Sequence, residues 1–559
     1  MSALRAHYRI AVLGTLVFLG WAFLLPAGVE GTEYYVSPSG DDGNSGKSPT
    51  EAWKTTGKVN AATFSPGDRV RFEGGATFSG GLYFDAADAG VPAAPVTVGS
   101  YGTGRATIDA GDGTGLLAYN SGGFEVRDLR FVGSGATTNT GSGIHFYTDL
   151  SGGVQLEHVY VDEVEVSGYG EWGILAGGGN GDTGYRDVRI TRAVCHDSAR
   201  GGIITYAANR NVHEDVYVGH CTAYNHAGIA GLTTNSGHGI VLGAVDGGTV
   251  ERCVAHDNGS LCDASEGPVG IWAYDSTEVT IQHNESYHNR TGGSADGGGF
   301  DFDQNVSNSV LQYNYSHDND GAGYLLCQSP ANDNFTGNTV RYNISENDGQ
   351  KNMFAGILTY GRVQSCDIYN NTVFTPSNQA AVRLVTSAYD DLRFHNNLLI
   401  TENGVALVKT ADTAGATFQG NNYYSSGDAF VINWGGTVYG SLAAWRAATG
   451  QEMLGGVDVG SSVDPMLTNP GGGGTVGNAD LLATLDAYRL RGGSPMIDAG
   501  LDLFGLFGIG PAVRDYYGTP VPAGSACDVG AHEYLVPEPG GLGLLGFGLL
   551  GLVRRKRRS

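Results

Sequence analysis

A short segment that opens with glycine, or once with alanine, recurs every 24–37 residues between about residues 115 and 425. Apolar residues alternate after this opening, and the first of them are Ile144, Ile174, Ile203, Ile240, Ile271, Phe300, Tyr324, Ile357 and Val382. A second alternating segment follows, as at 188–190 and 279–281. Short β-branched strands with this period, and without helical periodicity, are typical of a solenoid. The coils must stack, because no single repeat can bury a core alone.

Composition narrows the classes of function. The chain has 559 residues, 91 of them glycine, and a formal charge of −25. Such an acidic chain has no general attraction for phosphate backbones, so we expect no nucleic-acid partner. With 41% hydrophobic and 10% aromatic residues the chain can build a core. The glycines therefore serve tight turns rather than disorder, and a long helical protein is excluded.

One recurring position closes the second segment of each repeat. We assign it in turn to Cys195, Cys221, Cys253, Asn284, Asn314, Asn343, Asn370 and Asn396. Amides at one position of successive coils can hydrogen-bond as a ladder, and cysteine is a small apolar substitute there. The chain has seven cysteines and no CxxC motif, so we expect these three to pack rather than react, although export would permit disulfides.

Both ends of the chain resemble processing signals. Residues 1–30 carry two arginines, an apolar run and small residues, as a secretory signal peptide does; an uncleaved anchor is the alternative, for which the run is short. Residues 536–559 contain Val-Pro-Glu-Pro, a short apolar run and an arginine cluster, which closely resembles a bacterial PEP-CTERM sorting signal. This resemblance implies export, transient membrane anchoring, an exosortase-type partner, and a place in the cell envelope, on the outer surface or in the matrix.

The repeat resembles the right-handed parallel β-helix of pectate-lyase-like proteins, an architecture of many polysaccharide lyases, hydrolases and epimerases. Residues 34–41 and 66–72 look like its N-terminal cap, and 464–467, 488–500 and 528–534 look like a segment that precedes surface anchors. The resemblance implies an all-β monomer divided into a signal peptide at 1–30, a cap with first coils at 31–114, repeats at 115–425, a β-rich C-terminal segment at 426–535 and a sorting signal at 536–559. The glycine run 471–474 is expected to be a flexible insertion.

Alternate residues of a strand face opposite sides, so an inward apolar start defines two outward columns along the solenoid. The first column is His145, Leu175, Ile204, Val241, Trp272, Asp301, Leu325, Leu358 and Arg383. The second is Tyr147, Gly177, Tyr206, Gly243, Tyr274, Asp303, Cys327, Tyr360 and Val385. Asp301 and Asp303 thus share a face with Trp272 and Tyr274 of the preceding coil. We expect neighbouring turns to add Asp296, His317, Asp318 and Asp320.

Aromatic rings beside paired carboxylates suit a groove that cleaves glycosidic bonds, because rings cover sugar faces while two carboxyl groups supply acid and base. We therefore expect a polysaccharide-degrading glycoside hydrolase with Asp301 and Asp303 as its catalytic pair, and no required cofactor. Clustering should raise one pKa of the pair, but the sequence does not say which. Substrate contacts are expected from Trp272, Tyr274, Tyr206, Tyr360 and Arg383.

Other functions remain open at this point. Asp296 and Asp320 are candidate Ca²⁺ ligands, and their surroundings resemble the calcium-site stretches of family 9 polysaccharide lyases, which implies a Ca²⁺-dependent lyase or epimerase. Ala355, however, stands where that family has its lysine base, and Lys351 lies only nearby on a turn. A non-catalytic polysaccharide-binding surface protein, with an ordinary solvated aspartate face, is the third alternative. His145 and His238 are expected to be turn or surface residues.

Overall fold

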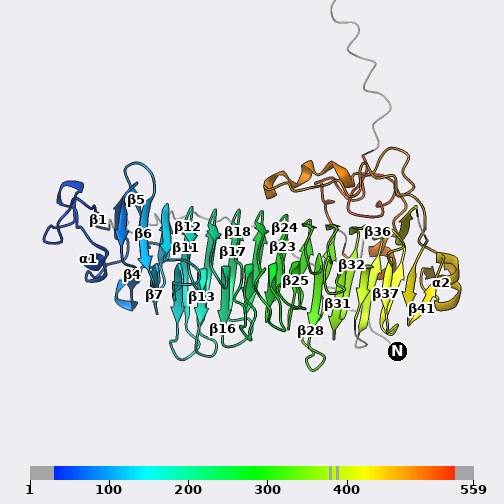
Figure 1. The fold of residues 1–559 in the computed structure, drawn as a ribbon, viewed down its shortest axis with the longest axis horizontal. Coiled ribbons are helices and arrows are strands. Elements are labelled where there is room, and N and C mark those ends of the chain that lie inside the picture. Colours follow the sequence, from blue (N-terminus) through cyan, green and yellow to red (C-terminus); the bar gives the residue numbers. More distant parts are fainter. Residues whose placement is uncertain (1–30, 377–379, 386–388, 428, 511, 536–559) are drawn as a thin grey trace, which may run out of the picture.

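The computed structural model describes residues 31–376, 380–385, 389–427, 429–510 and 512–535. The expected signal peptide and sorting signal lie outside these residues. The chain winds into a solenoid with three long sheets, here called A, B and C, and each complete coil contributes one strand to each sheet (Figure 1). Neighbouring strands are parallel, except the last pair of sheet C. Among the described residues, no helix is long and apolar enough to cross a membrane.

Sheet C carries the first strand of each predicted repeat. Its strands are β4(Leu82–Phe84), β7(Leu116–Tyr119), β10(Ile144–Thr148), β13(Trp172–Gly178), β16(Gly201–Ala207), β19(His238–Gly243), β22(Val269–Tyr274), β25(Gly298–Phe302), β28(Tyr324–Gln328), β31(Ala355–Gly361), β34(Ala380–Leu384), β37(Val408–Thr410), β40(Ile432–Trp434) and β41(Thr437–Tyr439). Their register pairs the whole first outward column coil by coil, from His145 to Arg383. The predicted face is therefore present.

Sheets A and B complete each coil. Sheet A contains β1(Glu33–Val36), β2(Arg69–Glu73), β5(Val96–Tyr101), β8(Phe124–Arg127), β11(Gln155–Asp162), β14(Gly184–Thr191), β17(His213–Gly219), β20(Val245–Glu251), β23(Thr277–Gln282), β26(Val310–Gln312), β29(Thr339–Arg341), β32(Gln364–Tyr369), β35(Asp390–His395) and β38(Ala416–Gln419). Sheet B contains β3(Thr77–Ser79), β6(Ala106–Gly111), β9(Leu129–Gly133), β12(Glu165–Ser167), β15(Val194–His196), β18(Thr222–Tyr224), β21(Val254–His256), β24(Glu285–Tyr287), β27(Tyr315–His317), β30(Ile344–Glu346), β33(Thr372–Thr375), β36(Leu398–Glu402) and β39(Asn422–Ser426).

One continuous core runs along the solenoid axis, from Val36 to Trp445. The N-terminal cap with α1(Thr56–Asn60) closes one end, and α2(Leu442–Thr449) closes the other with Trp445 packed against Phe418 and Trp434. Capping is required because the first and last coils would otherwise expose apolar core. The cysteines at positions 195, 221 and 253 lie buried in this core, and their thiols are free.

An amide ladder crosses the core at the turn from sheet A to sheet B. In each step a side chain accepts a hydrogen bond from the backbone N–H of the preceding coil, as Asn314 Oδ1 does from Asn284 N at 3.0 Å; the acceptor is an asparagine amide oxygen in every step except the first, a cysteine sulfur, and the last, a glutamate oxygen. The side chains that accept in this way are Cys253, Asn284, Asn314, Asn343, Asn371, Asn397, Asn421 and Glu452. These bonds satisfy polar backbone groups that burial removes from water.

The prediction was wrong for three of the residues assigned to the ladder. Cys195 lies inside β15, two residues past the ladder position, and pairs with Ala223. Asn370 and Asn396 each precede the true ladder residue by one, and both have left-handed φ values, 51° and 50°. Their amides turn outward and bind the returning C-terminal chain, as Asn370 Nδ2 does at 2.7 Å from the Asp528 carbonyl oxygen. Two asparagines stand side by side in each of these coils, so the sequence did not show which of the two occupies the ladder position.

The last part of the chain returns along the outside of sheet B and is called the strap here, residues 464–535. Figure 1 shows it in orange, lying along the solenoid from β36 back to β24. Its apolar side chains bury Tyr315, Phe374 and other outward residues of sheet B. The expected β-rich C-terminal segment is found only at its start, in β40, β41 and the pair β42(Met453–Leu454) and β43(Val457–Asp458); beyond these the chain is irregular apart from short 3₁₀ helices at Ala479–Thr484 and Asp486–Tyr488 and α3(Leu503–Phe507).

The glycine run 471–474 is docked on sheet B, so the prediction of a flexible insertion was wrong. Gly473 N donates to Glu346 Oε2 at 3.1 Å. A Cβ atom at Gly473 would lie 2.3 Å from that oxygen and 2.6 Å from Tyr315 Oη. A side chain at this position would therefore require Glu346, Tyr315 or the docked backbone itself to shift.

Candidate active site

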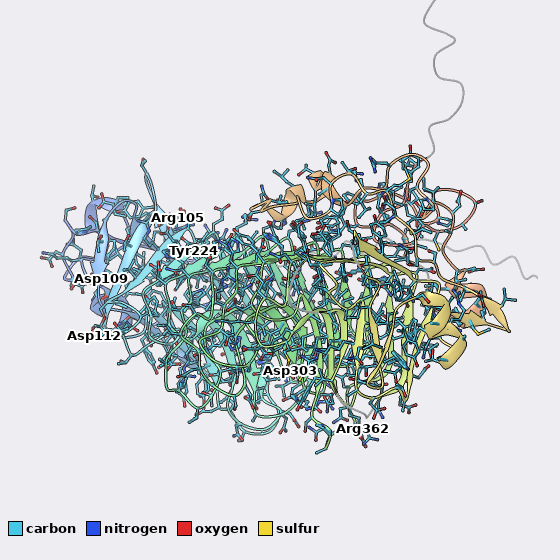
Figure 2. The ribbon with its side chains drawn as sticks, turned by 45° about the vertical axis from the view of Figure 1, so that its right-hand side comes forward. Arg105, Asp109, Asp112, Tyr224, Asp303 and Arg362 are labelled. Carbon is cyan, nitrogen blue, oxygen red and sulfur yellow. The ribbon has the colours of Figure 1, made fainter. Side chains whose placement is uncertain are left out.

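A cleft of about 990 Å³ opens on sheet C, over β22, β25, β28 and β31. Figure 2 shows Asp303 in the lower half of the view, away from the strap along the top. Residues from the columns and turns line the cleft: Trp172, His238, Glu266, Trp272, Tyr274, Asp275, Asp296, Asp301, Asp303, Gln304, Asn305, Cys327 and Tyr360 are among them. The register of sheet C places Trp272 beside Asp301 on the next coil.

Asp301 is the most deeply placed carboxyl group of the cleft, with only 2% of its surface exposed. Its Oδ1 atom has no hydrogen-bond partner among the described residues. Burial raises the pKa of Asp301 well above its usual range, and the negative charges of Asp303 and Asp296 add to the rise. Asp301 is therefore suited to hold a proton near neutral pH and to donate it.

Asp303 has a different environment two residues later. Its Oδ1 accepts hydrogen bonds from the backbone N of Gln304 at 2.7 Å and from Gln304 Nε2 at 3.1 Å. Burial raises the pKa of Asp303, but these hydrogen bonds and the Cys327 thiol lower it in part. Because donors favour the charged form, Asp303 is the more easily ionised member of the pair.

Asp296 enters the cleft from the turn before β25. Its Oδ2 accepts a hydrogen bond from Gly267 N at 2.9 Å, which ties this turn to the preceding coil. Burial, followed by the charge of Asp303, raises the pKa of Asp296 to about 7. Three carboxyl groups with raised pKa values thus share one cleft, an arrangement found more often at functional sites than elsewhere.

A stack of rings forms one side of the cleft. The centroids of Trp272 and Tyr274 lie 5.2 Å apart, and Trp272 Nε1 donates to His238 Nδ1 at 3.0 Å. The Trp172 ring stacks on the ring of His238, with their centroids 5.8 Å apart. The prediction that His238 is a turn or surface residue was wrong: it is buried in β19, and burial lowers its pKa to about 3, so it is neutral and fixes the Trp272 ring. His145 is half-buried in β10 and contacts Tyr206 Oη at 3.2 Å.

The structure brings some predicted side chains to the cleft and places others elsewhere. Tyr360 lines it and is 42% exposed. Tyr206, Arg383 and Asp320 do not line it. Tyr206 packs against the apolar cluster next to Trp172. The guanidinium of Arg383 donates to the carbonyl oxygen of Met353.

Asp320, a candidate calcium ligand, forms ion pairs with Arg290 at 3.0 Å and Lys351 at 3.1 Å. No group of three or more His, Cys, Asp or Glu side chains suited to a metal ion was found in the part of the chain that the structure describes. The expectation that His317 and Asp318 join the cluster from a neighbouring turn was wrong. His317 belongs to β27 of sheet B, because each coil has three sides and the chain turns a corner before it reaches sheet C.

Several cleft residues were missed or given no role in the sequence analysis. Gln304 follows Asp303 directly, and Cys327 stands in the second outward column, so both had a positional signal. Glu266 comes from a long turn between β21 and β22, where the period carries no information. Burial and the charges of Asp303, Asp301 and Asp296 raise the pKa of Cys327, which keeps it a neutral thiol.

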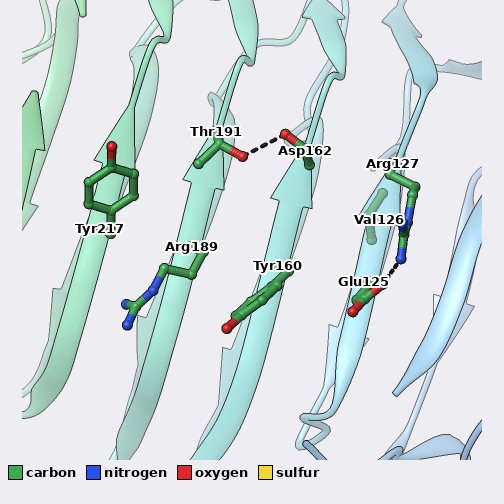
Figure 3. A pocket seen from close by; sticks show the side chains of 8 residues that line it. All are labelled: Glu125, Val126, Arg127, Tyr160, Asp162, Arg189, Thr191 and Tyr217. Carbon is green, nitrogen blue, oxygen red and sulfur yellow. Dashed lines mark hydrogen bonds and ion pairs between the residues drawn. The ribbon is translucent and has the colours of Figure 1, made fainter. Parts of the chain in front are cut away.

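A second hollow, of about 470 Å³, lies on sheet A (Figure 3). Tyr160, Arg189 and Tyr217 stand in register on β11, β14 and β17. Each of its charged groups has an ion-pair partner: Arg127 contacts Glu125, Arg189 contacts Asp187 at 3.2 Å, and Asp162 contacts Arg192. Paired surface charges of this kind are ordinary, so the cleft on sheet C is the stronger candidate site.

Comparisons with known proteins agree with this architecture. The family model "Right handed beta helix region" matches residues 172–373, and the "PEP-CTERM protein-sorting motif" matches residues 535–558. No curated protein matches the sequence. The second motif indicates export through an exosortase-type sorting system to the cell surface.

Solved structures resemble the fold at low sequence identity. A GH136 lacto-N-biosidase from Eubacterium ramulus has a TM-score of 0.48 and 17% identity, over 68% of this chain and 65% of that chain. Pectate lyase Pel9A has a TM-score of 0.40 and 16% identity, over 90% and 96%. A mannuronic acid specific family 6 polysaccharide lyase from human gut microbiota has a TM-score of 0.43 and 16% identity, over 71% and 88%.

The chain thus spans about 65% of the length of the lacto-N-biosidase, and at these identities the likeness concerns the fold alone. Three long sheets that form the sides of one solenoid, the matching repeat model and the matching terminal motif lead to one conclusion. The chain is a right-handed parallel β-helix protein that carries a PEP-CTERM sorting motif.

Proposed function

We propose that this protein is an exported glycoside hydrolase that cleaves a polysaccharide in the cleft on sheet C. The observation that carries the proposal is a buried aspartate with a bare oxygen atom, Asp301, beside a hydrogen-bonded aspartate, Asp303, in a cleft walled by aromatic rings. Glycoside hydrolysis requires one protonated and one ionised carboxyl group at the scissile bond. Different environments of two neighbouring carboxyl groups are how a protein obtains both states at one pH.

The roles follow from those environments. Asp301 is the acid that protonates the leaving oxygen, because burial and two negative neighbours raise its pKa. Asp303 is the ionised partner, held by Gln304, and acts as base toward water or as nucleophile. Trp272 and Tyr274 cover the apolar face of a sugar ring, and Tyr360 extends the binding surface along the solenoid axis. Tyr206 and Arg383 lie outside the cleft, so they contact only a polysaccharide that is long enough to extend beyond it.

The proposed location is the outer surface or surrounding matrix, where an exosortase-type enzyme has removed the terminal motif and the protein acts as a monomer. Removal of the motif would release the transient membrane anchor. The proposed chemistry uses carboxyl groups and water, so it requires no metal. A calcium-dependent lyase or epimerase, and a protein that only binds polysaccharide, are the outcomes against which the proposal is tested.

The test is a panel of polysaccharides incubated with the purified protein, with and without EDTA, while reducing ends and ultraviolet absorbance of unsaturated products are followed together. New reducing ends without absorbance, insensitive to EDTA, are expected. Absorbance that EDTA abolishes would replace the hydrolase with a calcium lyase. Binding without any release of products would leave only a polysaccharide-binding role. The anomer released first, followed by NMR, then separates an inverting from a retaining mechanism.

A further inference from the structure

The cleft is lined by acidic side chains. Five carboxyl groups face it, and no lysine or arginine of the described residues does; the carboxyl groups are those of Glu266, Asp275, Asp296, Asp301 and Asp303. The one histidine of the lining, His238, is neutral, since burial lowers its pKa to about 3. A cleft of this kind repels anionic groups and attracts cationic ones.

Only one of the five carboxyl groups has a counter-charge. Asp275 lies 4.0 Å from Arg210 Nε, and its Oδ1 accepts a hydrogen bond from Asn305 Nδ2 at 2.6 Å. The other four form no ion pair with any residue that the structure describes. The charge of Glu266 acts on both Asp296 and Asp303, so these side chains belong to one electrostatic cluster.

A hydrogen-bond donor is also missing inside the cleft. Asp301 Oδ1 is buried and has no partner among the described residues, and a buried acceptor without a donor is costly. An ammonium group offers three donors and a positive charge at once. Trp272 and Tyr274 stand next to the same cluster, and aromatic faces attract cations as well as sugar rings.

Resting on the hydrolase proposed above, we propose that the glycan in this cleft carries free amino groups, as unacetylated hexosamines do, and that chains of uronic acids are rejected. The ammonium group of the sugar supplies the counter-charge that Glu266 and Asp296 lack and a donor to the unpartnered Oδ1 atom of Asp301, whose other oxygen carries the proton for the leaving group. A uronate would bring its own negative charge against the same side chains, at a cost in affinity.

A test must separate the charge of the cleft from the charge of the whole protein, because a chain with a net charge of −25 attracts any polycation. Two variants make the same change in different places. Glu266→Gln removes one charge from the cleft, and Glu278→Gln removes one from the exposed face of sheet A, outside the cleft. Both side chains are exposed, so both variants are expected to fold.

The experiment measures binding to an oligosaccharide array in which each backbone occurs in amino, N-acetyl, hydroxyl and uronic forms. Amino forms are expected to bind about tenfold more tightly than N-acetyl forms at low salt, with uronic forms weakest and the preference shrinking as salt is added. Glu266→Gln should reduce the preference roughly two- to fivefold, and Glu278→Gln should leave it unchanged. Equal binding of amino and N-acetyl forms, tight binding of a uronic form, absence of any amino ligand, or equal effects of the two variants would each overturn the proposal.

Cleavage of the same array is followed in parallel, so that the two proposals fail separately. Amino forms that bind selectively but are never cleaved contradict the hydrolase and leave the charge selectivity intact. Cleavage of neutral forms without any preference for amino forms contradicts the selectivity and leaves the hydrolase intact.

Discussion

Two buried carboxyl groups of this solenoid, Glu285 under the strap and Asp301 in the cleft, have opposite surroundings. Glu285 is completely buried and accepts from Val476 N and Gly477 N at 2.7 Å each, while His317 Nε2 lies 3.2 Å away. Asp301 is equally buried, yet its Oδ1 has no partner in the described part of the chain. Burial by itself therefore does not distinguish a structural acid from a reactive one.

The difference lies in whether the folded chain supplies the donors. Glu285 is satisfied by a segment that follows it by almost two hundred residues, so its role is to hold the strap on sheet B. A buried carboxyl group that stays unpaired lowers stability, and chains retain such groups where chemistry or binding requires them. The unpaired carboxyl group in the cleft is thus expected to lower the free energy of unfolding, and the hydrogen bonds between Glu285 and the strap are expected to raise it.

Asp301→Asn is expected to have the largest effect on turnover. Loss of the proton donor should lower turnover by about a thousandfold, whereas the thermal midpoint should stay the same or rise, because an unpaired buried carboxyl group is removed. Turnover and thermal unfolding are measured on the same preparation. The matched control is Asp246→Asn on the exposed face of sheet A, which should change neither. Full activity in Asp301→Asn would remove this residue from the mechanism.

Glu285→Gln should have the reverse effect. The substitution leaves His317 and two backbone N–H groups poorly matched, so the free energy of unfolding should fall by about 3 kcal/mol, with turnover per folded molecule unchanged. Denaturant unfolding gives the first quantity, and turnover below the unfolding range gives the second. A variant as stable as the parent would show that the strap does not depend on this carboxylate.

Gly473→Ala tests the docking of the strap at a second point. A methyl group there meets Glu346 Oε2 and Tyr315 Oη, so either these side chains or the strap must shift, at an expected cost of about 1–3 kcal/mol. Gly474→Ala is the neighbouring comparison: space is open around its Cβ position, but its φ of 61° adds backbone strain. Hydrogen exchange of the 471–474 amides should accelerate in Gly473→Ala, and unchanged protection would contradict the close approach.

Titration of His317 and of Asp296 should change the stability of the fold with pH, by a smaller amount and with a sign that follows from each pKa. Burial alone would lower the pKa of His317, but the hydrogen bonds that its ring donates to Asp318 and Glu285 raise this pKa from 6.5 to about 9. Its stabilisation is therefore complete below 6.5 and is lost as the pH rises through about 9. Asp296, with a pKa raised from 3.8 to about 7, favours the folded state most below 3.8, and this contribution is lost as the pH rises through about 7.

Thermal midpoints across this pH range check both signs. Asp296→Asn should flatten the change near pH 7 and leave the change near pH 9, while His317→Gln should do the opposite. Identical profiles for the two variants would show that neither group is linked to folding as described.

The parts of the site that could be predicted are those that depend on the strand period. Alternation within a strand is a local property, so Asp301, Trp272 and their column followed from the spacing of the repeat alone. The residues that turns bring to the cleft were less predictable. Glu266 was missed and His317 was misplaced, because a turn of irregular length carries no period and can end on any of three sheets.

The solenoid, its outward columns and the terminal sorting motif could be predicted from the sequence, since each depends on neighbouring residues or on a fixed repeat. The folded chain alone shows which asparagine of each pair joins the ladder, where the C-terminal segment docks, and which carboxyl groups of the described residues lack partners. These features depend on contacts between segments that are far apart in the chain and follow no period. Satisfaction of a buried acid is a property of the assembled fold, so only the fold distinguishes Asp301 from Glu285.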